Sequence, residues 1–383
     1  MARRSSSSPV QEAGTPRRPA ELRRVTMTDI AREAGCSQAT VSFVLNDVKS
    51  VRLSPETKQR VLDTARRLGY SVQRRRVERK PRAAEARAGR IGIIVDQLAT
   101  SPETVQAVDG LTQAARANGI SVFVAQSQSD PEIEAELVST FLEQGVIGLV
   151  YMTIFTREIE ATPLLSRLGI PVLLLNCYTA DQAFPSVVPS EIAGGQRSTR
   201  YLIEKGHRRI ATVTGEIWME AAQDRLKGYR RALATADIPF DPDLVFEGDW
   251  SASAGYEATR KILALPEVPT AIFCQNDRMS IGCYEALKEA GYDIPGDMSV
   301  IGYDDEEIAR HLHPQLTTSI LPHRAMGQWI AEQLIDGLAA KGERYAIIKL
   351  ECPLVERSSV AAPREANVLA AQRNRAKPVH TRS

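Results

Sequence analysis

Short apolar runs recur along most of the chain from Ile91 onward, and this recurrence constrains the fold more than any other feature. The runs are Ile91–Val95, Val122–Ala125, Val146–Tyr151, Pro171–Leu175, Ile210–Val213, Thr270–Cys274 and Val300–Tyr303. Segments long enough for a crossover helix separate most of them, such as Glu132–Gln144, Ile192–Lys205 and Met279–Ala290. Buried strands that alternate with helices predict an α/β fold of doubly wound parallel sheets.

The α/β region spans residues 91–362, roughly 270 residues, which is long for a single sheet. We therefore expect two lobes with a cleft between them, since small-molecule sites are concave and often lie between domains. Parallel sheets of this type bind ligands at the carboxyl ends of their strands. Asp96 directly follows the first apolar run and is expected at the mouth of the cleft.

The region before the α/β pattern carries signals for three short helices within residues 25–70. Thr26 begins a capping box, Gly35 is a natural helix stop, and Ser37 and Ser54 can cap the second and third helices. Two short helices that meet at a glycine turn, with small or polar residues at the start of the second, predict a helix-turn-helix. The alternative is a small helical hairpin that serves only packing.

Charge is distributed unevenly along the chain, although the net charge is only +1. Residues 1–90 hold 21 Lys and Arg against 9 Asp and Glu, whereas residues 91–383 hold 27 against 38. We interpret residues 1–24 as a disordered basic arm, 71–90 as a basic hinge or linker, and 363–383 as a flexible tail. A basic module on an acidic body indicates nucleic acid or another anionic surface as partner.

Several protein classes receive no support from the sequence. No run of about 18 apolar residues predicts a membrane span, and the N-terminal residues lack the apolar segment of a secretory signal. The five cysteines are scattered without a CxxC pair, the histidines have no metal-ligand spacing, and no phosphate-binding loop is present. We therefore expect a cytoplasmic protein that uses no membrane, metal or cofactor.

Residues of the predicted helix-turn-helix have the chemistry needed to read double-stranded DNA. The Gln38 amide can reach base edges, and Ala39 offers a methyl-sized contact. Other side chains can donate to phosphates or bases, namely those of Thr28, Thr40, Ser42 and Asn46. The expected DNA-binding set also includes Ser37, Phe43, Arg52 and Arg79. Phe43 either touches a thymine methyl or packs within the headpiece.

From Thr26 to Asn46 the chain resembles the opening of the LacI/GalR family of bacterial transcription regulators, with Cys36 at the usual Val. The likeness continues at Asp224–Tyr229, Asn276–Met279 and Val300–Asp305. It implies a DNA-reading headpiece, a hinge, and a two-lobed core like that of periplasmic sugar-binding proteins. The expected lobes are about 91–189 with 322–350, and about 190–321 with 351–362.

The resemblance also implies how such a protein works. Family members bind near-palindromic operators as homodimers, and a small molecule, often a sugar, shifts their affinity for DNA. Arg225, Trp250, Asn276 and Asp304 stand where the family places effector contacts, and their chemistry suits a polyol. Met219 stands where several relatives use a polar residue, which makes the expected pocket more apolar and disfavours purines and simple galactosides.

The hinge departs from the family pattern. Gln73 replaces the usual Asn, Arg76 replaces Ala, Val77 replaces Arg, and Arg79 replaces the Leu that wedges into the minor groove. An Arg favours a narrow, electronegative minor groove but does not unstack a base step. One hypothesis is therefore that this linker binds by charge and kinks DNA less, and the alternative is a solvated charge run.

These features predict a sequence-specific transcription regulator, a repressor of carbohydrate uptake or catabolism genes under the control of a sugar-like effector. A second hypothesis is a cytoplasmic sugar-binding protein without specific operator binding. A third is an α/β enzyme that acts on sugars, but no acid, base or nucleophile constellation can be assembled for it, so we expect no enzymatic activity.

Overall fold

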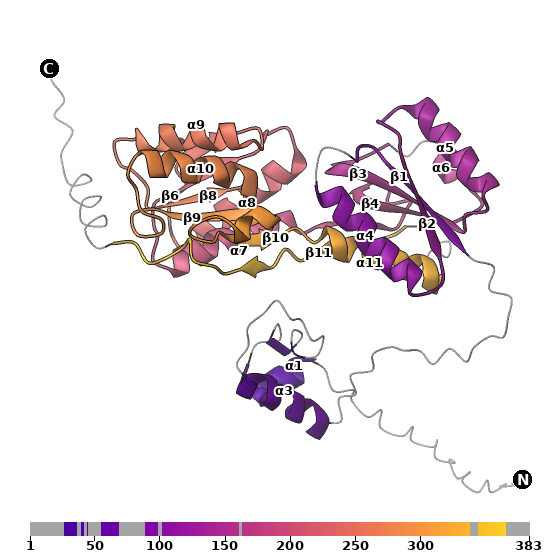
Figure 1. Ribbon diagram of the computed structural model, residues 1–383, viewed down its shortest axis with the longest axis horizontal. Coiled ribbons are helices and arrows are strands. Elements are labelled where there is room, and N and C mark those ends of the chain that lie inside the picture. Colours follow the sequence, from indigo (N-terminus) through magenta and orange to yellow (C-terminus); the bar gives the residue numbers. More distant parts are fainter. Residues whose placement is uncertain are drawn as a thin grey trace, which may run out of the picture. The chain divides into compact units, whose positions relative to one another are not determined.

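The computed structural model describes residues 27–36, 40–41, 44, 55–68, 89–98, 102–160, 163–337 and 344–364. The chain divides into two compact units, Met1–Glu85 and Ala86–Ser383, and each is described by itself (Figure 1). Among the described residues no helix is both long and apolar enough to cross a membrane.

The first unit is a small helical domain with its own apolar core. Helix α1 spans Met27–Ala34 and helix α3 spans Pro55–Arg67. Between them Val41 is helical and fully buried, and it packs with Ile30 of α1 and Val61 of α3. Three helical elements around one core are what the capping signals predict, although the caps at Thr26, Ser37 and Ser54 lie outside the described residues.

The first lobe of the second unit contains a six-stranded sheet in the order β11-β5-β4-β3-β1-β2, with every recorded pairing parallel. Its strands are β1 (Arg90–Val95), β2 (Ser121–Gln126), β3 (Gly148–Glu158), β4 (Val172–Tyr178), β5 (Ser186–Pro189) and β11 (Ile347–Leu350). Its helices are α4 (Pro102–Arg116), α5 (Pro131–Glu143), α6 (Pro163–Ser166) and α11 (His323–Asp336).

The second lobe contains another six-stranded sheet, in the order β12-β10-β9-β8-β6-β7. Its strands are β6 (Ile210–Thr214), β7 (Val245–Glu247), β8 (Ala271–Cys274), β9 (Ser299–Asp304), β10 (Thr317–Ile320) and β12 (Leu354–Val355). Its helices are α7 (Glu191–Glu204), α8 (Glu220–Thr235), α9 (Ala252–Leu263), α10 (Asp277–Glu289) and the short 3-10 turns η1 (Pro242–Leu244) and η2 (Glu307–Arg310). The edge strand β12 pairs antiparallel to β10, so this sheet is not wholly parallel as the pattern predicted.

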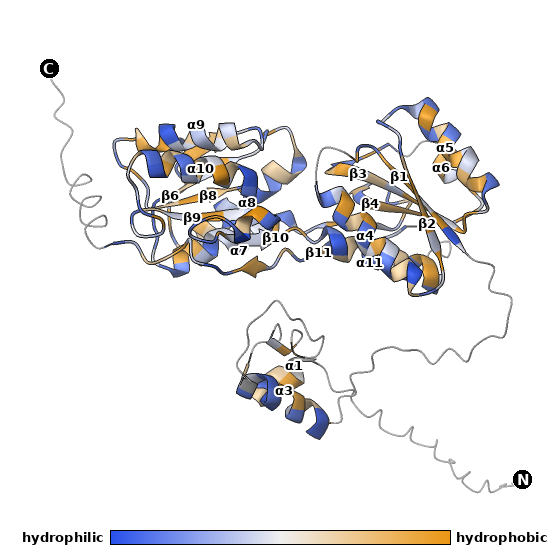
Figure 2. Ribbon diagram, in the orientation of Figure 1, coloured by the Kyte–Doolittle hydropathy of each residue, from blue (hydrophilic) through white to orange (hydrophobic). Residues whose placement is uncertain are grey.

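Alternation along the strands explains why each sheet carries helices on both faces. In β1, Ile91 and Ile93 face α4 and α11, whereas Ile94 faces the cluster formed with α5 and α6. In β8, Ile272 packs with α9 and α10, and Phe273 packs with α7 and α8. Figure 2 shows the outcome, with apolar strands at the centre of each lobe and polar helix surfaces outside. The predicted doubly wound architecture with two lobes is thereby confirmed.

The chain passes between the lobes three times: from β5 to α7, from β10 to α11, and from β11 to β12. Each lobe therefore holds segments that lie far apart in sequence, and the passages connect them side by side (Figure 1). Three connections of this kind are typical of proteins whose lobes close around a ligand, and the carboxyl ends of both sheets face the cavity between the lobes.

Candidate ligand-binding site

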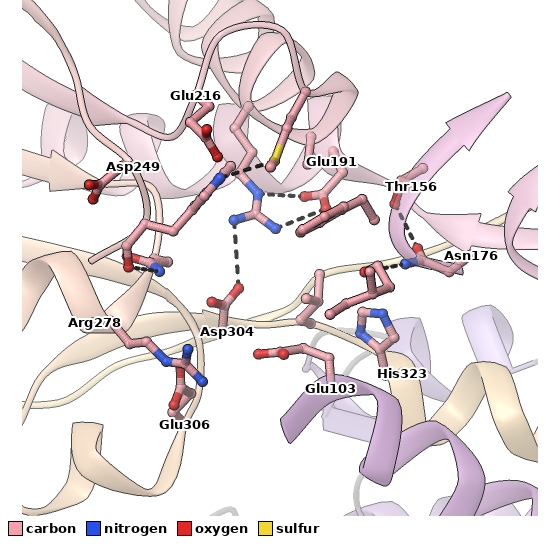
Figure 3. Close-up of a pocket in the computed structure, with 18 of the residues that line it drawn as sticks. Glu103, Thr156, Asn176, Glu191, Glu216, Asp249, Arg278, Asp304, Glu306 and His323 are labelled. Carbon is pink, nitrogen blue, oxygen red and sulfur yellow. Dashed lines mark hydrogen bonds and ion pairs between the residues drawn. The ribbon is translucent and has the colours of Figure 1, made fainter. Parts of the chain in front are cut away.

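A cavity of about 340 Å³ lies between the two lobes and is lined by residues that follow the strands of both sheets (Figure 3). Lobe 1 contributes Gln97 after β1, Glu103 at the start of α4, Ile154–Thr156 of β3 and Asn176 of β4. Lobe 2 contributes residues that follow β6, β7, β8 and β9, together with Glu191 and Arg225 on α7 and α8. The strand-end rule thus locates the cavity correctly.

Most residues predicted to bind the effector line this cavity: Met219, Arg225, Trp250, Asn276 and Asp304. Asp96 is not among the lining residues, whereas its neighbour Gln97 is. The buried Asp96 carboxylate accepts hydrogen bonds of 2.8 Å from the backbone of Ile154 and Gln97, and it lies 3.1 Å from Arg157. Asp96 therefore ties the end of β1 to β3, and its position after the strand did not predict the direction of its side chain.

Arg225 lines the cavity and uses three of its five N–H donors on protein partners. Its side chain is 4% exposed, and Nε and Nη2 donate to the two oxygens of Glu191 at 2.8 and 2.9 Å. Nη1 donates to the carbonyl of Gln275 and lies 3.6 Å from Asp304 Oδ1. Burial alone would lower the pKa of Arg225, but Glu191 and Asp304 raise it, so the guanidinium stays charged.

Asp304 ends β9 with a backbone φ of 110°, a conformation that non-glycine residues rarely adopt. Its carboxylate is nearly buried, and its Oδ1 has no hydrogen-bond partner. Burial raises the pKa of Asp304 well above its usual range, and Arg225 opposes that shift. A strained backbone and a buried carboxylate oxygen without a hydrogen bond, on a residue that lines the cavity, are features expected of a binding group.

Trp250 forms one wall of the cavity and is fixed by three contacts. Its backbone φ is 68°, and its Nε1 donates to Met219 Sδ at 3.0 Å. A side chain at Gly215 would come within 1.9 Å of the indole, so only glycine leaves room for the ring. The guanidinium carbon of Arg225 lies 5.6 Å from the ring centre. The indole is therefore a preset surface with an apolar neighbour in Met219.

The side-chain amide of Asn276 serves the fold as well as the cavity. Its Oδ1 caps helix α10 by accepting from the backbone of Met279 at 2.8 Å, and its Nδ2 donates to the carbonyl of Trp250 at 2.9 Å. These bonds fix the amide and also hold the strained backbone at Trp250. Only the second amide hydrogen and the second lone pair remain for a ligand.

The sequence analysis missed the acidic character of the lining. Six carboxylates line the cavity against two guanidinium groups, and they belong to Glu103, Glu191, Glu216, Asp249, Asp304 and Glu306. Arg278 Nε lies 3.0 Å from Glu306 Oε1, and Arg225 is paired with Glu191. One carboxylate oxygen each from Glu103, Asp304 and Glu306 lie within 4.8 Å of one another. The position of Glu306 just after a predicted strand could have indicated that it lines the site. Glu103 lies at the start of a helix in the other lobe, and nothing in the sequence pattern indicated the same for it.

His323, at the start of α11, also lines the cavity and was not predicted as a site residue. It is 2% exposed, and neither ring nitrogen has a hydrogen-bond partner among the described residues. Burial lowers the pKa of His323 to about 4 although Glu103 opposes the shift, so the ring is neutral near pH 7. Figure 3 shows the ring next to Glu103, where it reaches into the cavity.

Two side-chain contacts among the described residues join β3 and β4 of lobe 1 to lobe 2. The Tyr178 hydroxyl of β4 lies 3.1 and 3.0 Å from the two oxygens of Glu220 on α8. Phe155 of β3 makes an edge-to-face contact with the largely exposed Trp218, with ring centroids 6.3 Å apart. These contacts depend on the separation of the lobes, so they report on lobe closure.

The predicted DNA-binding residues belong to the first unit. Thr28 lies in α1, and Thr40 is helical. The remaining members of the set lie outside the described residues: Ser37, Gln38, Ala39, Ser42, Phe43, Asn46, Arg52 and Arg79. Their roles, and those of the hinge residues, stay predictions.

Comparison with known proteins separates the chain into the same two parts. The profile of lacI-family bacterial regulatory proteins matches residues 26–73, and that of periplasmic binding proteins and the sugar binding domain of the LacI family matches residues 88–358. The chain belongs to the LacI family. This LacI-family chain is accordingly a ligand-controlled repressor with a DNA-binding helix-turn-helix and an effector-binding core.

Individual relatives agree over nearly their whole length. The transcriptional repressor PurR of Histophilus somni is 31% identical over 335 residues, which cover 88% of this chain and 98% of PurR. The ribose operon repressor of Haemophilus influenzae is 30% identical, with the same coverage. Among solved structures, the lac repressor dimer bound to operator and the anti-inducer ONPF is 30% identical and covers 88% of this chain and 99% of its own, with a TM-score of 0.60. The CelR–cellobiose complex is 29% identical and covers 88% of this chain and 100% of its own, with a TM-score of 0.59.

Proposed function

We propose that this LacI-family repressor controls carbohydrate uptake or catabolism genes in the cytoplasm, and that its effector is a polyhydroxylated molecule held in the cavity between the lobes. The observation that carries the proposal is the cavity itself, whose lining combines the Trp250 indole with several carboxylates. Such a combination of a flat apolar surface with hydroxyl-accepting oxygens suits a sugar ring. Relatives named for ribose and cellobiose support the same class.

Regulation in this proposal follows from the location of the cavity. An effector that contacts Asn176 of lobe 1 and Asp304 of lobe 2 binds the closed arrangement of the lobes better than an open one. Closure then changes the relation between the two headpieces of a homodimer on a near-palindromic operator. A coupling of about 1–3 kcal/mol corresponds to roughly 5–150-fold regulation.

In lobe 2 the proposed effector contacts are Met219, Trp250, Asn276 and Asp304, and Arg225 positions Asp304 through their 3.6 Å ion pair; in lobe 1 the contact is Asn176. We assign Asp96 to the structure of lobe 1 rather than to the ligand. On DNA, Gln38 and Ala39 are proposed to read bases, with the basic hinge on the minor groove. No catalytic function is proposed for the cavity, so a bound sugar should be recovered unchanged.

Selection of bound duplexes from a randomised DNA library, with full-length protein at moderate salt, tests the regulator part of the proposal. Enrichment of a near-palindrome is expected, and its centre reports on the Arg-rich hinge. Salt-sensitive binding without enrichment would contradict sequence-specific repression and leave only non-specific affinity. No DNA binding at all would favour the second hypothesis, a sugar-binding protein without operator recognition.

A further inference from the structure

We propose that the effector carries a protonated amine, and that Glu103, Asp304 and Glu306 bind its ammonium group inside the cavity. This inference rests on the proposed function, because it takes the cavity as the effector site. It narrows the ligand class from polyols in general to amine-bearing polyols such as amino sugars.

The geometry of the three carboxylates fits an ammonium group. Glu103 begins α4 in lobe 1, Asp304 ends β9 in lobe 2, and Glu306 follows two residues later. One oxygen of each lies within 4.8 Å of the other two. The centre of a triangle of that size is at most about 2.8 Å from each corner, which is the usual length of a charge-assisted N–H···O hydrogen bond. An ammonium group has three such donors to offer when it is attached to a carbon skeleton.

Burial raises the pKa of Asp304 and of Glu306, and the neighbouring arginines oppose these shifts only in part, so a further cation would stabilise the ionised carboxylates. Arg278 pairs with Glu306 at 3.0 Å, and Arg225, already bonded twice to Glu191, comes no nearer to Asp304 than 3.6 Å. Within the described part of the chain, no cation pairs with the Glu103 carboxylate. These carboxylates would repel an anionic effector such as a sugar phosphate. A monovalent cation would instead reduce the repulsion among the carboxylates.

His323 is a separate observation that indicates a polar ligand at the same place. The ring is almost fully buried, both nitrogens lack partners among the described residues, and Figure 3 shows it beside Glu103 in the cavity wall. A buried imidazole without hydrogen bonds is costly, and a polar ligand group within reach of the ring would satisfy it. As a neutral ring it offers one acceptor and one donor, which suits an amine or hydroxyl of the same ligand.

The surroundings favour an organic ammonium over a divalent metal ion. Calcium requires six to eight oxygen ligands, and two guanidinium groups beside the carboxylates would repel a doubly charged ion. The cavity lining also includes Trp250 and Met219, whose apolar surfaces suit a carbon skeleton. Because Glu103 belongs to lobe 1 and the other two carboxylates to lobe 2, the ammonium group would also join the lobes.

Calorimetric titration of the full-length protein tests the inference with matched ligand pairs. The probes are glucosamine, galactosamine and mannosamine, each beside its N-acetyl derivative and its neutral parent sugar, with CaCl2 alone as a further arm. We expect at least one amine to bind about 10-fold or more tightly than both neutral partners. Glu103→Gln should remove most of that preference, because the amide oxygen can still accept a hydrogen bond but carries no negative charge to attract the ammonium group. Glu307→Gln removes the same charge from the exposed residue next to Glu306, which is outside the cavity lining, and should keep the preference.

Each result of this titration decides the question. Amines that bind no better than their neutral partners, or a preference that survives Glu103→Gln, would overturn the ammonium site. If calcium binds and the amines do not, and Glu103→Gln abolishes the calcium binding, the three carboxylates form a metal site instead. If an amine binds through Glu103, Asp304 and Glu306 but does not change operator affinity, the ammonium site is supported and the proposed regulatory function is wrong.

Discussion

The Arg225 guanidinium and the Glu191 carboxylate form a bidentate pair of 2.8 and 2.9 Å, with both side chains 4% exposed. The pair joins the first turn of α7 to α8 and holds Arg225 against the ring of Tyr303, 3.9 Å from its centre. Arg225 thus lines the cavity from a fixed position, 3.6 Å from Asp304, where its charge opposes the rise in the pKa of that carboxyl group.

Arg225→Met should destabilise the core by about 3–5 kcal/mol, because Glu191 would be left as an unpaired buried charge. Urea unfolding followed by circular dichroism measures this. Arg200→Met is the matched control on α7, where an exposed pair with Glu204 at 3.4 Å should contribute less than about 1 kcal/mol. An equal decrease in the free energy of unfolding of the two variants would show that the buried Arg225–Glu191 pair contributes no more to stability than an exposed pair. The double variant Arg225→Met/Glu191→Gln should recover part of the loss.

Gly215→Ala should weaken effector binding, because its methyl group would overlap the Trp250 indole at 1.9 Å and push the ring from the cavity wall. Overpacking of this kind costs about 1–3 kcal/mol. Tryptophan fluorescence and calorimetric titration with the amine that binds wild type measure both effects. Gly169→Ala is the control, since a side chain there meets nothing within 4 Å. Unchanged affinity in Gly215→Ala would remove Trp250 from the proposed contacts.

We expect the folded protein to lose stability in acid because of the buried His207. Its Nε2 lies 2.9 Å from the Ala361 carbonyl and its Nδ1 lies 2.8 Å from the Thr270 hydroxyl, so the buried ring is bound in its neutral form. Burial lowers the pKa of His207 to about 4, from 6.5 in the unfolded chain. Because the unfolded chain binds the proton first, this stability is present above pH 6.5 and is lost as the pH falls towards 4, by at most about 3 kcal/mol.

Unfolding of His207→Gln across this pH range checks the prediction. The variant should be less stable than wild type near pH 7 and should lose less stability between pH 6.5 and 4. His311→Gln, at an exposed position, should follow wild type. Parallel curves for His207→Gln and wild type would show that another group causes the acid sensitivity.

Gln38→Ala should change which base pairs are preferred and cost about 1–3 kcal/mol on the selected operator. Gln59→Ala is the matched control, because Gln59 of α3 already donates to Asp63 at 3.0 Å on an exposed face. Competition between the selected duplex and its single-base variants measures selectivity. Selectivity that Gln38→Ala leaves intact would show that the recognition helix lies elsewhere.

The fold was largely predictable from the sequence, because apolar runs such as Ile210–Val213 and Val300–Tyr303 are dense enough to mark central strands. Short edge strands were not: β12 has two residues, and its antiparallel pairing depends on the last passage between lobes. The strand-end rule found the cavity but not the side-chain directions. Asp96 and Gln97 are neighbours after β1, and only Gln97 lines the cavity.

The charge of the site was less predictable because it is assembled from distant segments. Glu191 lies 34 residues before Arg225, and Glu103 reaches Asp304 from the other lobe. Sequence spacing gives no measure of such distances. The family resemblance placed Arg225 among the effector contacts, and this residue lines the cavity, but its pairing with the distant Glu191 could not be read from the sequence.

Operator affinity measured with and without a saturating cavity ligand tests the central claim most directly. Fluorescence anisotropy of the selected duplex at fixed salt should show a Kd that the ligand changes by roughly 5–150-fold. The operator should change the Kd of the ligand by the same factor, because the coupling is reciprocal. If the operator affinity is the same with saturating ligand as without ligand, the cavity between the lobes does not control DNA binding.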